Sequence, residues 1–433
     1  MAHQTRQTLD PEAEYRLLRQ RLDRNVTGAP DTAAMRRVLR LLFTPADAHV
    51  VRQMPVLIAV PELADRLGIP LADLDEHITD LARRGLVLDF ERGGTRYAMP
   101  SPVVIGFFEF TFMRMRPEAP MEEIAEAFDA LFDDEEAVRS IFRGSTQVGR
   151  SLVREEALPA DPPVEVLDWE RATSIVAGAS RAAVSLCSCR NHARYLGKAC
   201  DAPLRTCLSF DGSADALVRA GIAEPISTAE ALEILTEAKA AGLAQTGDNV
   251  KAGPGYICNC CGCCCGMMRS IKQFGIFDGI VASNWVATID LTICRGCGTC
   301  VKACPAGAIA LEPSNGKGRR RNWAILDAER CLGCGVCFDV CRWEAHGMEP
   351  REDRPFVPAD TLERIAAMAI ERGKIGDFLL ANTGSRLAHA AATVLRAIEK
   401  TPPWRALVAA ESVRSTFLKG FAAAAARART DDA

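Results

Sequence analysis

The sequence lacks the apolar segments that direct a chain into a membrane or an export route. No window of about 18 apolar residues is uninterrupted. The most apolar run, Val103 to Met113, is short and contains Glu109. The N-terminus enters charged sequence without the apolar stretch of a signal peptide. We therefore expect no membrane span and a cytoplasmic location, where the 18 cysteines stay reduced and do not form a disulfide framework.

Several common catalytic and binding motifs are also missing. The chain has no glycine-rich phosphate loop of the P-loop or dinucleotide type, and no Gly-x-Ser-x-Gly or His-Glu-x-x-His. Its net charge of −4 gives no general attraction to nucleic acid or anionic membranes. With 433 residues, 48% of them apolar, it is long enough for two to four domains. These absences leave the cysteines as the main source of chemistry.

Eight cysteines form two runs with the same internal spacing. The runs are Cys294-x2-Cys297-x2-Cys300-x3-Cys304 and Cys331-x2-Cys334-x2-Cys337-x3-Cys341. Three thiolates two residues apart on a tight loop can reach three irons of one cluster, while the fourth cysteine points away from it. A zinc site needs only four thiolates and gives no reason for the doubled spacing.

Residues 294–341 therefore resemble the two-cluster bacterial ferredoxins. The resemblance implies two [4Fe–4S] clusters whose runs exchange their fourth ligand. The expected ligand sets are Cys294, Cys297, Cys300 and Cys341 for one cluster, and Cys331, Cys334, Cys337 and Cys304 for the other. Two features depart from the family: Arg342 follows Cys341 where proline is usual, and a basic loop over residues 316–321 separates the runs. We expect that loop, with Lys317, Arg319, Arg320 and Arg321, to dock an acidic redox partner.

The other ten cysteines lie between residues 187 and 265. Cys187-x-Cys189-x10-Cys200-x6-Cys207 offers four thiols over 21 residues, with His192 as an alternative ligand. Six thiols over eight residues follow in Cys258-Asn-Cys260-Cys261-Gly-Cys263-Cys264-Cys265, and adjacent side chains diverge too much for all six to reach one centre. We expect the first four to hold one metal centre, and Cys258, Cys261 and Cys264 to contribute to another cluster. Iron–sulfur, zinc and inert buried thiols remain open for both groups.

The region from residue 35 to residue 105 has the order helix, helix, turn, helix and β-hairpin. Helices are expected over 35–43, 61–68 and 70–84, and strands over 86–90 and 95–99. This order resembles a winged helix-turn-helix. Residues 36–100 contain nine Arg and nine Asp plus Glu, so their positive and negative charges balance. The helix that would enter a major groove carries Asp73, Asp75, Glu76 and Asp80. DNA binding normally depends on positive charge, so we expect a protein-interaction or self-association module instead.

The expected fold class is multi-domain α+β, and the whole chain resembles multi-domain iron–sulfur proteins of anaerobic bacteria. The predicted parts are an N-terminal helix over 1–34, a winged-helix-like domain over 35–115, an α/β domain over 116–250, a Cys-rich segment over 251–284, a two-cluster ferredoxin-like domain over 285–350 and a helical C-terminal region over 351–433. Within them we expect a helix over 121–143, strands over 164–167 and 182–186, and helices that begin at Ser227, Asp360 and Ser385.

The leading functional hypothesis is an electron-transfer protein with two [4Fe–4S] clusters and a further cysteine-ligated centre, exchanging electrons with a partner redox protein. A redox-sensing transcription regulator and a reductase with its active centre at Cys258–Cys265 are the alternatives. The acidic helix argues against the regulator. Complete four-cysteine ligation argues against catalysis at the two clusters themselves. Oligomeric state and enzymatic activity remain open.

Overall fold

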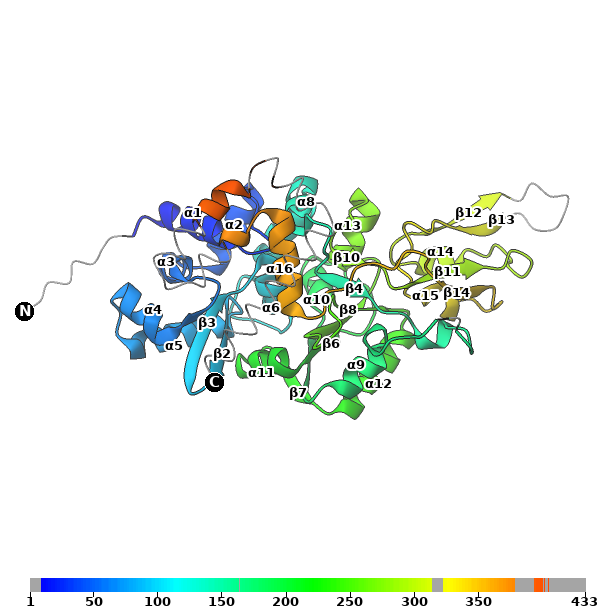
Figure 1. Ribbon diagram of the computed structural model, residues 1–433, viewed down its shortest axis with the longest axis horizontal. Coiled ribbons are helices and arrows are strands. Elements are labelled where there is room, and N and C mark those ends of the chain that lie inside the picture. The colour runs from blue at the N-terminus through cyan, green and yellow to red at the C-terminus, as the bar shows by residue number, and fades with distance from the viewer. Residues whose placement is uncertain are drawn as a thin grey trace, which may run out of the picture. The chain divides into compact units, whose positions relative to one another are not determined.

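The computed structural model describes residues 9–162, 164–313, 322–377, 393–399, 401 and 404 of the 433-residue chain (Figure 1). The chain divides into two compact units. The first comprises Met1–Thr111, Met115–Arg143 and Ala369–Phe417, and the second comprises Phe112–Arg114, Gly144–Met368 and Leu418–Ala433. The predicted α/β domain over 116–250 is thus divided near residue 143.

The first unit combines helices with one small sheet. Its helices are α1 (Pro11–Leu22), α2 (Ala33–Leu42), α3 (Pro45–Gln53), α4 (Val60–Leu67), α5 (Leu71–Arg83), most of α6 (Phe108–Phe112), α7 (Met121–Phe132) and α8 (Glu135–Phe142). Strands β1 (Ile58–Ala59), β2 (Val87–Arg92) and β3 (Thr95–Pro100) pair antiparallel in the order β1-β3-β2. The apolar face of α2 buries Met35, Val38 and Leu39, and α2 packs against α7.

Every helix and strand predicted between residues 35 and 105 has a counterpart within a few residues. The structure adds β1 and α3, which begins at a capping box between Thr44 and Asp47. The helix expected over 121–143 is two helices, because α7 ends at Asp133 and the Asp134 carboxylate accepts from Ala137 N to start α8. The winged-helix assignment itself stays a prediction.

The second unit contains a seven-stranded sheet. Its strands are β4 (Gly149–Ser151), β5 (Ala182–Leu186), β6 (Arg205–Phe210), β7 (Glu224–Ile226), β8 (Ala244–Asp248), β9 (Tyr256–Cys260) and β10 (Ile280–Val281). Their order is β10-β4-β8-β9-β6-β5-β7, and only the β10–β4 pair is parallel. Both β9 and β10 come from the segment over 251–284. That Cys-rich segment is therefore part of the sheet and not a separate element.

Five helices accompany these strands. They are α9 (Ala172–Gly178), α10 (Ser188–Tyr195), α11 (Asp211–Arg219), α12 (Thr228–Ala240) and α13 (Gly266–Phe274). Helices α9 and α12 pack together and, with β5, β6 and β9, enclose an apolar core that includes Val176, Ile234 and Phe210. The Ser227 hydroxyl accepts from Glu230 N and starts α12 as predicted. The strand predicted over 164–167 is absent from the described residues 164, 165, 166 and 167, which are followed by a 3₁₀ helix over Asp168–Glu170 and then by α9.

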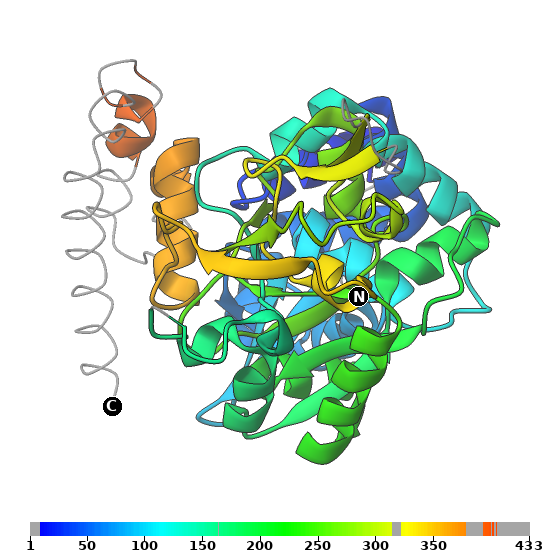
Figure 2. The same ribbon diagram turned by 90° about the vertical axis from the view of Figure 1, so that its right-hand side faces the viewer.

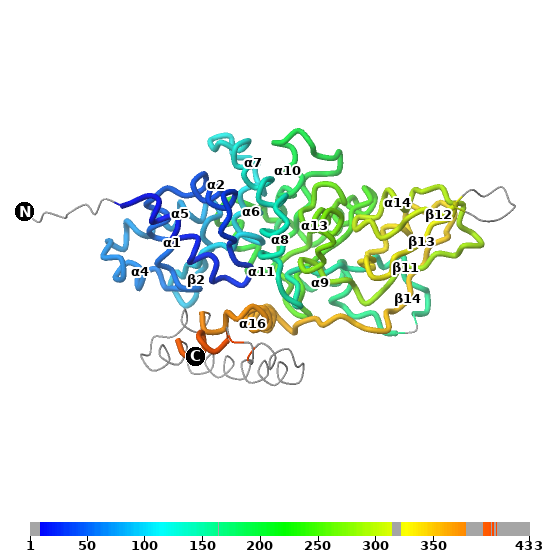
Figure 3. The backbone as a smooth tube through the Cα atoms, turned by 90° about the horizontal axis from the view of Figure 1, so that it is seen from above, coloured from blue at the N-terminus to red at the C-terminus, as the bar shows by residue number. Residues whose placement is uncertain are grey.

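Two antiparallel strand pairs follow the sheet in the same unit. Strand β11 (Trp285–Ile289) pairs with β14 (His346–Pro350), and β12 (Ile309–Pro313) pairs with β13 (Asn322–Leu326). Short helices α14 (Thr299–Ala303) and α15 (Val336–Asp339) each follow a cysteine loop. The two pairs run from yellow-green (β11) through yellow (β12 and β13) to gold (β14) in Figure 2, and Figure 3 follows the chain through them.

The described C-terminal part is helical. Helix α16 (Thr361–Arg372) begins where the Asp360 carboxylate accepts from Glu363 N at 2.9 Å, as predicted, and residues 393–398 are also helical. The predicted cap at Ser385 and the basic loop over 316–321 lie outside the described residues. Within the described part of the chain, no helix is long and apolar enough to cross a membrane.

Candidate iron–sulfur and cysteine-rich centres

The first cysteine run surrounds a small cavity. Cys294 and Cys297 lie on the loop before α14, and Cys300 lies within that helix. The cavity is lined by these three cysteines and by Cys341, which belongs to the second run. The fourth cysteine of the second run therefore lies with the first three of the first run. We call these four residues the outer set.

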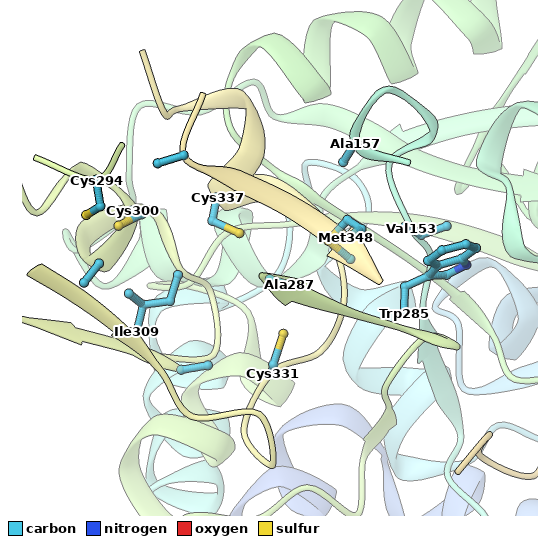
Figure 4. Packing of buried hydrophobic residues seen from close by; sticks show 13 residues of the cluster. Val153, Ala157, Trp285, Ala287, Cys294, Cys300, Ile309, Cys331, Cys337 and Met348 are labelled. Atoms are coloured by element: carbon cyan, nitrogen blue, oxygen red, sulfur yellow. The ribbon is translucent and has the colours of Figure 1, made fainter. Parts of the chain in front are cut away.

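The second run forms a buried counterpart. Cys331, Cys334 and Cys337 are each 8% exposed. Burial raises the pKa of the Cys334 thiol to about 12, and the neighbouring Cys304 and Cys331 act in the same direction. Burial is also the largest cause of the raised pKa of the Cys337 thiol. Four neighbouring thiols raise that pKa further: Cys334, Cys331, Cys304 and Cys300. Cys304 of the first run thus lies within electrostatic range of the second run. We call Cys304, Cys331, Cys334 and Cys337 the inner set; Figure 4 shows members of both sets in one buried cluster.

Two equivalent glycines allow the cysteine loops to pack against neighbouring strands. Gly296 and Gly333 have φ of +63° and +65°, and a Cβ on either would stand 2.0 Å from a backbone carbonyl oxygen of the facing strand. Only glycine satisfies both constraints. Their amides donate to Cys294 Sγ and Cys331 Sγ, each at 3.4 Å. Such N–H···S bonds stabilise thiolate ligands.

The two sets differ in their access to solvent. Cys297 of the outer set is exposed, and the Thr299 hydroxyl lowers the pKa of its thiol. Exposed Trp343 lies beside it in the cavity lining, under the guanidinium groups of Arg295 and Arg342. The inner set has three buried members. The outer set is therefore more accessible to solvent than the inner set.

A buried arginine contacts the inner set. Arg154 is 0% exposed; its amide donates to Cys334 O at 3.3 Å, its Nη2 donates to Leu243 O at 2.7 Å, and its guanidinium pairs with Asp339. Burial lowers the pKa of Arg154, while negative charge at Cys334 acts the other way. Arg154 follows β4, so it brings a positive charge from the seven-stranded sheet to the inner set.

Nine of the other ten thiols form two groups in space. In the compact group, the Sγ atoms of Cys200, Cys261, Cys263 and Cys264 all lie within 4.8 Å of one another. The extended group consists of Cys189, Cys207, Cys258, Cys260 and Cys265. Its contacts run in a series: Cys265 Sγ lies 3.5 Å from Cys260 Sγ. Cys258 is within hydrogen-bonding range of Cys207 and Cys260. Cys265 is within hydrogen-bonding range of Cys189.

These groups correct the grouping expected from the sequence. The set Cys187, Cys189, Cys200 and Cys207 is divided, because Cys200 belongs to the compact group. The set Cys258, Cys261 and Cys264 is also divided, because Cys258 belongs to the extended group.

The two remaining candidates lie outside both groups. Cys187 lies beside the extended group, where burial and, secondarily, Cys189 and Cys207 raise the pKa of its thiol. His192 packs edge-on against Phe112 with ring centroids 5.1 Å apart. Its ring nitrogens are not among the ligand atoms of the compact group.

Sequence reasoning missed Cys260, Cys263 and Cys265 as members of these groups. The adjacent pairs Cys260-Cys261 and Cys264-Cys265 were the available signal. The two side chains of each of these pairs diverge, so each pair sends one thiol to each group, whereas neighbouring Cys263 and Cys264 both lie in the compact group. The buried Arg190 was also missed as a bridging charge; it donates to Asn259 O and Thr206 Oγ1 and lies near Cys261 and Cys260.

The extended group adjoins the inner set. Cys260 and Cys265 share an apolar cluster with Ala306 and Leu332, and Cys304 packs against that cluster. The loop between Cys260 and Cys265 is close to the end of the first cysteine run, since a Cβ on Gly262 would lie 2.9 Å from Pro305 Cα. The outer set, the inner set and the extended group thus follow one another through a single compact unit.

Comparison with known proteins supports one segment of this arrangement. Residues 293–345 match the family described as the 4Fe-4S dicluster domain. No curated protein and no solved structure matches the chain. The family match spans both cysteine runs, and so the chain contains a ferredoxin-like iron–sulfur segment over residues 293–345.

Proposed function

We propose that this chain is an electron-transfer protein in which the outer and inner sets each hold a [4Fe–4S] cluster. The observation that supports this most directly is the position of the two fourth cysteines: Cys341 lines the cavity of the first run, and Cys304 lies within electrostatic range of the second. Each set then offers the four thiolates that such a cluster requires. Bound clusters supply one-electron chemistry. The chain would hold them, bury the inner one and place the Arg154 guanidinium close to it.

The surroundings of the outer set suit a redox partner with an acidic surface. Ile293, Leu311 and Trp343 are 40%, 38% and 39% exposed. The Arg295 and Arg342 guanidinium carbons lie 5.5 and 4.9 Å from the Trp343 ring centroid. An aromatic anchor flanked by arginines is typical of interaction surfaces, and the positive charge favours encounter with an acidic protein.

The extended group is the proposed third cysteine-ligated centre. Its five thiols are spread over a series of contacts, which suits a cluster better than a single ion. Cys304 of the inner set packs against the apolar cluster of Cys260 and Cys265, so the third centre would adjoin the inner cluster. Cys260 and Cys265 are 8% and 5% exposed, and this burial favours electron transfer over a reductase that admits a substrate there.

The ligand exchange is tested by serine variants of anaerobically purified protein. The native chain should contain at least about eight iron and eight sulfide from the two sets. Cys304→Ser should damage the inner cluster and Cys341→Ser the outer one, resolved as separate EPR signals on reduction. Cys187→Ser is the control and should leave both signals unchanged. Selective loss of the outer signal in Cys304→Ser would refute the exchange, and iron well below eight in the native protein would refute the function.

The docking surface is tested by electron exchange with an acidic ferredoxin. Trp343→Ala should slow the exchange severalfold, and the effect of Arg342→Gln should be greatest at low salt because charge steering is screened over about 10 Å at 0.1 M ionic strength. Phe356→Ala is the matched control, since Phe356 is 42% exposed and is not in the outer cavity lining. Equal rates for Trp343→Ala and the control would remove this surface from the proposal.

The first unit is proposed as an interaction or self-association module. Two of the arginines that could contact DNA are engaged within the fold, since Arg96 pairs with Asp75 at 2.9 Å and Arg84 with Asp80 at 2.8 Å. Fluorescence anisotropy of the whole protein against duplex fragments should give no binding tighter than the nonspecific range, roughly 10⁻⁴–10⁻⁶ M. Sub-micromolar, sequence-selective binding that depends on cluster oxidation would favour the regulator instead.

A further inference from the structure

The compact group has the geometry of a single-ion site. Cys264 Sγ lies 3.8 Å from both Cys263 Sγ and Cys200 Sγ, and all four sulfurs fall within 4.8 Å of one another. Four sulfurs at about 2.3 Å from a tetrahedral zinc ion lie about 3.8 Å apart. A [4Fe–4S] cube places an iron between each ligand and the others, so its thiolates stand farther apart. The spacing therefore fits one ion and leaves no room for a cube.

The surroundings of the compact group suit thiolates better than neutral core thiols. Cys264 N donates to Cys261 Sγ at 3.3 Å, an amide bond that stabilises negative charge on sulfur. The Arg190 guanidinium, in a side chain only 1% exposed, lies within hydrogen-bonding range of Cys261. A tetrathiolate zinc site has a net charge of −2, so a buried cation beside it lowers the cost of burial. Cys263 is exposed, which core packing does not explain.

We infer that Cys200, Cys261, Cys263 and Cys264 bind one zinc ion, a site separate from the dicluster segment and from the proposed third centre. Zinc favours tetrahedral thiolate ligation, and four protein ligands leave no open position, which is typical of a structural site. The ion would join the loop after α10 to the loop between β9 and α13. It would thereby fix the turn from which Cys260 and Cys265 point the other way, into the extended group. The inference does not depend on the proposed electron transfer.

The site is tested by metal analysis of the full-length holoprotein. Native protein should contain about one zinc per chain. Cys263→Ser alters the exposed ligand, so it should preserve the fold while speeding zinc release to a colorimetric chelator by roughly tenfold or more. Cys264→Ser should lose most of the zinc. Cys187→Ser removes a thiol that is not a member of the compact group, and it should retain native zinc.

Iron is measured in the same samples and separates the two hypotheses. Iron at the native level with zinc lost from Cys264→Ser supports the zinc site whether or not electron transfer is the function. Native protein without zinc, or Cys263→Ser and Cys264→Ser variants with unchanged zinc content and release, would overturn it. Loss of iron instead of zinc from both variants, together with the visible thiolate-to-iron bands of a mononuclear centre in native protein, would also overturn it.

Discussion

Removing the positive charge of Arg154 should lower the reduction potential of the inner cluster. Arg154 is fully buried, its amide contacts Cys334 O, and its charge lies close enough to Cys334 and Cys337 for the thiols to affect its pKa. Reduction adds an electron to the cluster, and a nearby cation stabilises the added charge. Arg154→Met keeps an unbranched apolar chain in the site and removes only the charged group.

The size of the change follows from Coulomb's law. A unit charge about 8 Å from a redox centre is worth about 2 kcal/mol at an effective dielectric constant of about 20. For a one-electron couple, about 1.4 kcal/mol corresponds to about 59 mV, so the full charge is worth about 90 mV. Asp339 keeps its own charge in the variant, and solvent entry at its exposed side screens part of the effect. We therefore expect a fall of about 50–90 mV.

The assay is an EPR-monitored redox titration of protein with full iron content. Arg154→Lys retains the charge and should shift the potential by much less than Arg154→Met. Arg342→Gln removes an exposed charge near the outer set, and its smaller shift should affect the outer cluster and fade with salt. Unchanged inner potential in an iron-replete Arg154→Met protein, or equal shifts for Lys and Met, would refute the electrostatic reasoning.

One further variant in each unit tests how that unit is held together. Gly333→Ala should lose the inner cluster and retain the outer one in iron and EPR measurements, because a Cβ there meets a carbonyl oxygen at 2.0 Å; Gly197→Ala has a similar positive φ with open space and should keep both. Asp47→Asn should reduce the free energy of unfolding at pH 7 by about 1 kcal/mol after allowance for solvent screening. Although burial raises the pKa of Asp47, bonds from His77, Thr44 N and Arg84 lower it to about 2, so its contribution is present above pH 4 and is lost as pH falls towards 2. Denaturant titrations by circular dichroism should therefore converge for wild type and variant near pH 2, and a constant difference would contradict the assignment.

Local sequence patterns were sufficient where a structure depends on neighbouring residues. Helices α2, α4 and α5 and the hairpin of β2 and β3 follow from apolar periodicity and from the Gly93-Gly94 turn. The segment over 164–167 alternates like a strand, yet it is not one, because its residues have no pairing partner in the seven-stranded sheet. Strand formation requires that partner, and a local pattern does not reveal it.

The spacing of the cysteines was enough to predict that residues 294–341 hold two equivalent cysteine loops, because a spacing of two residues between thiols is a local constraint on one turn of chain. How the other thiols divide into groups depends instead on contacts between residues far apart in the sequence. Cys200 and Cys264 are 64 residues apart in sequence, and they meet because β9 pairs with both β6 and β8 and so delivers the loop after it to the loop after α10. In the pairs Cys260-Cys261 and Cys264-Cys265, one thiol then points to each side of that loop, whereas neighbouring Cys263 and Cys264 both face the compact group. Sequence distance therefore does not determine which thiols share a centre.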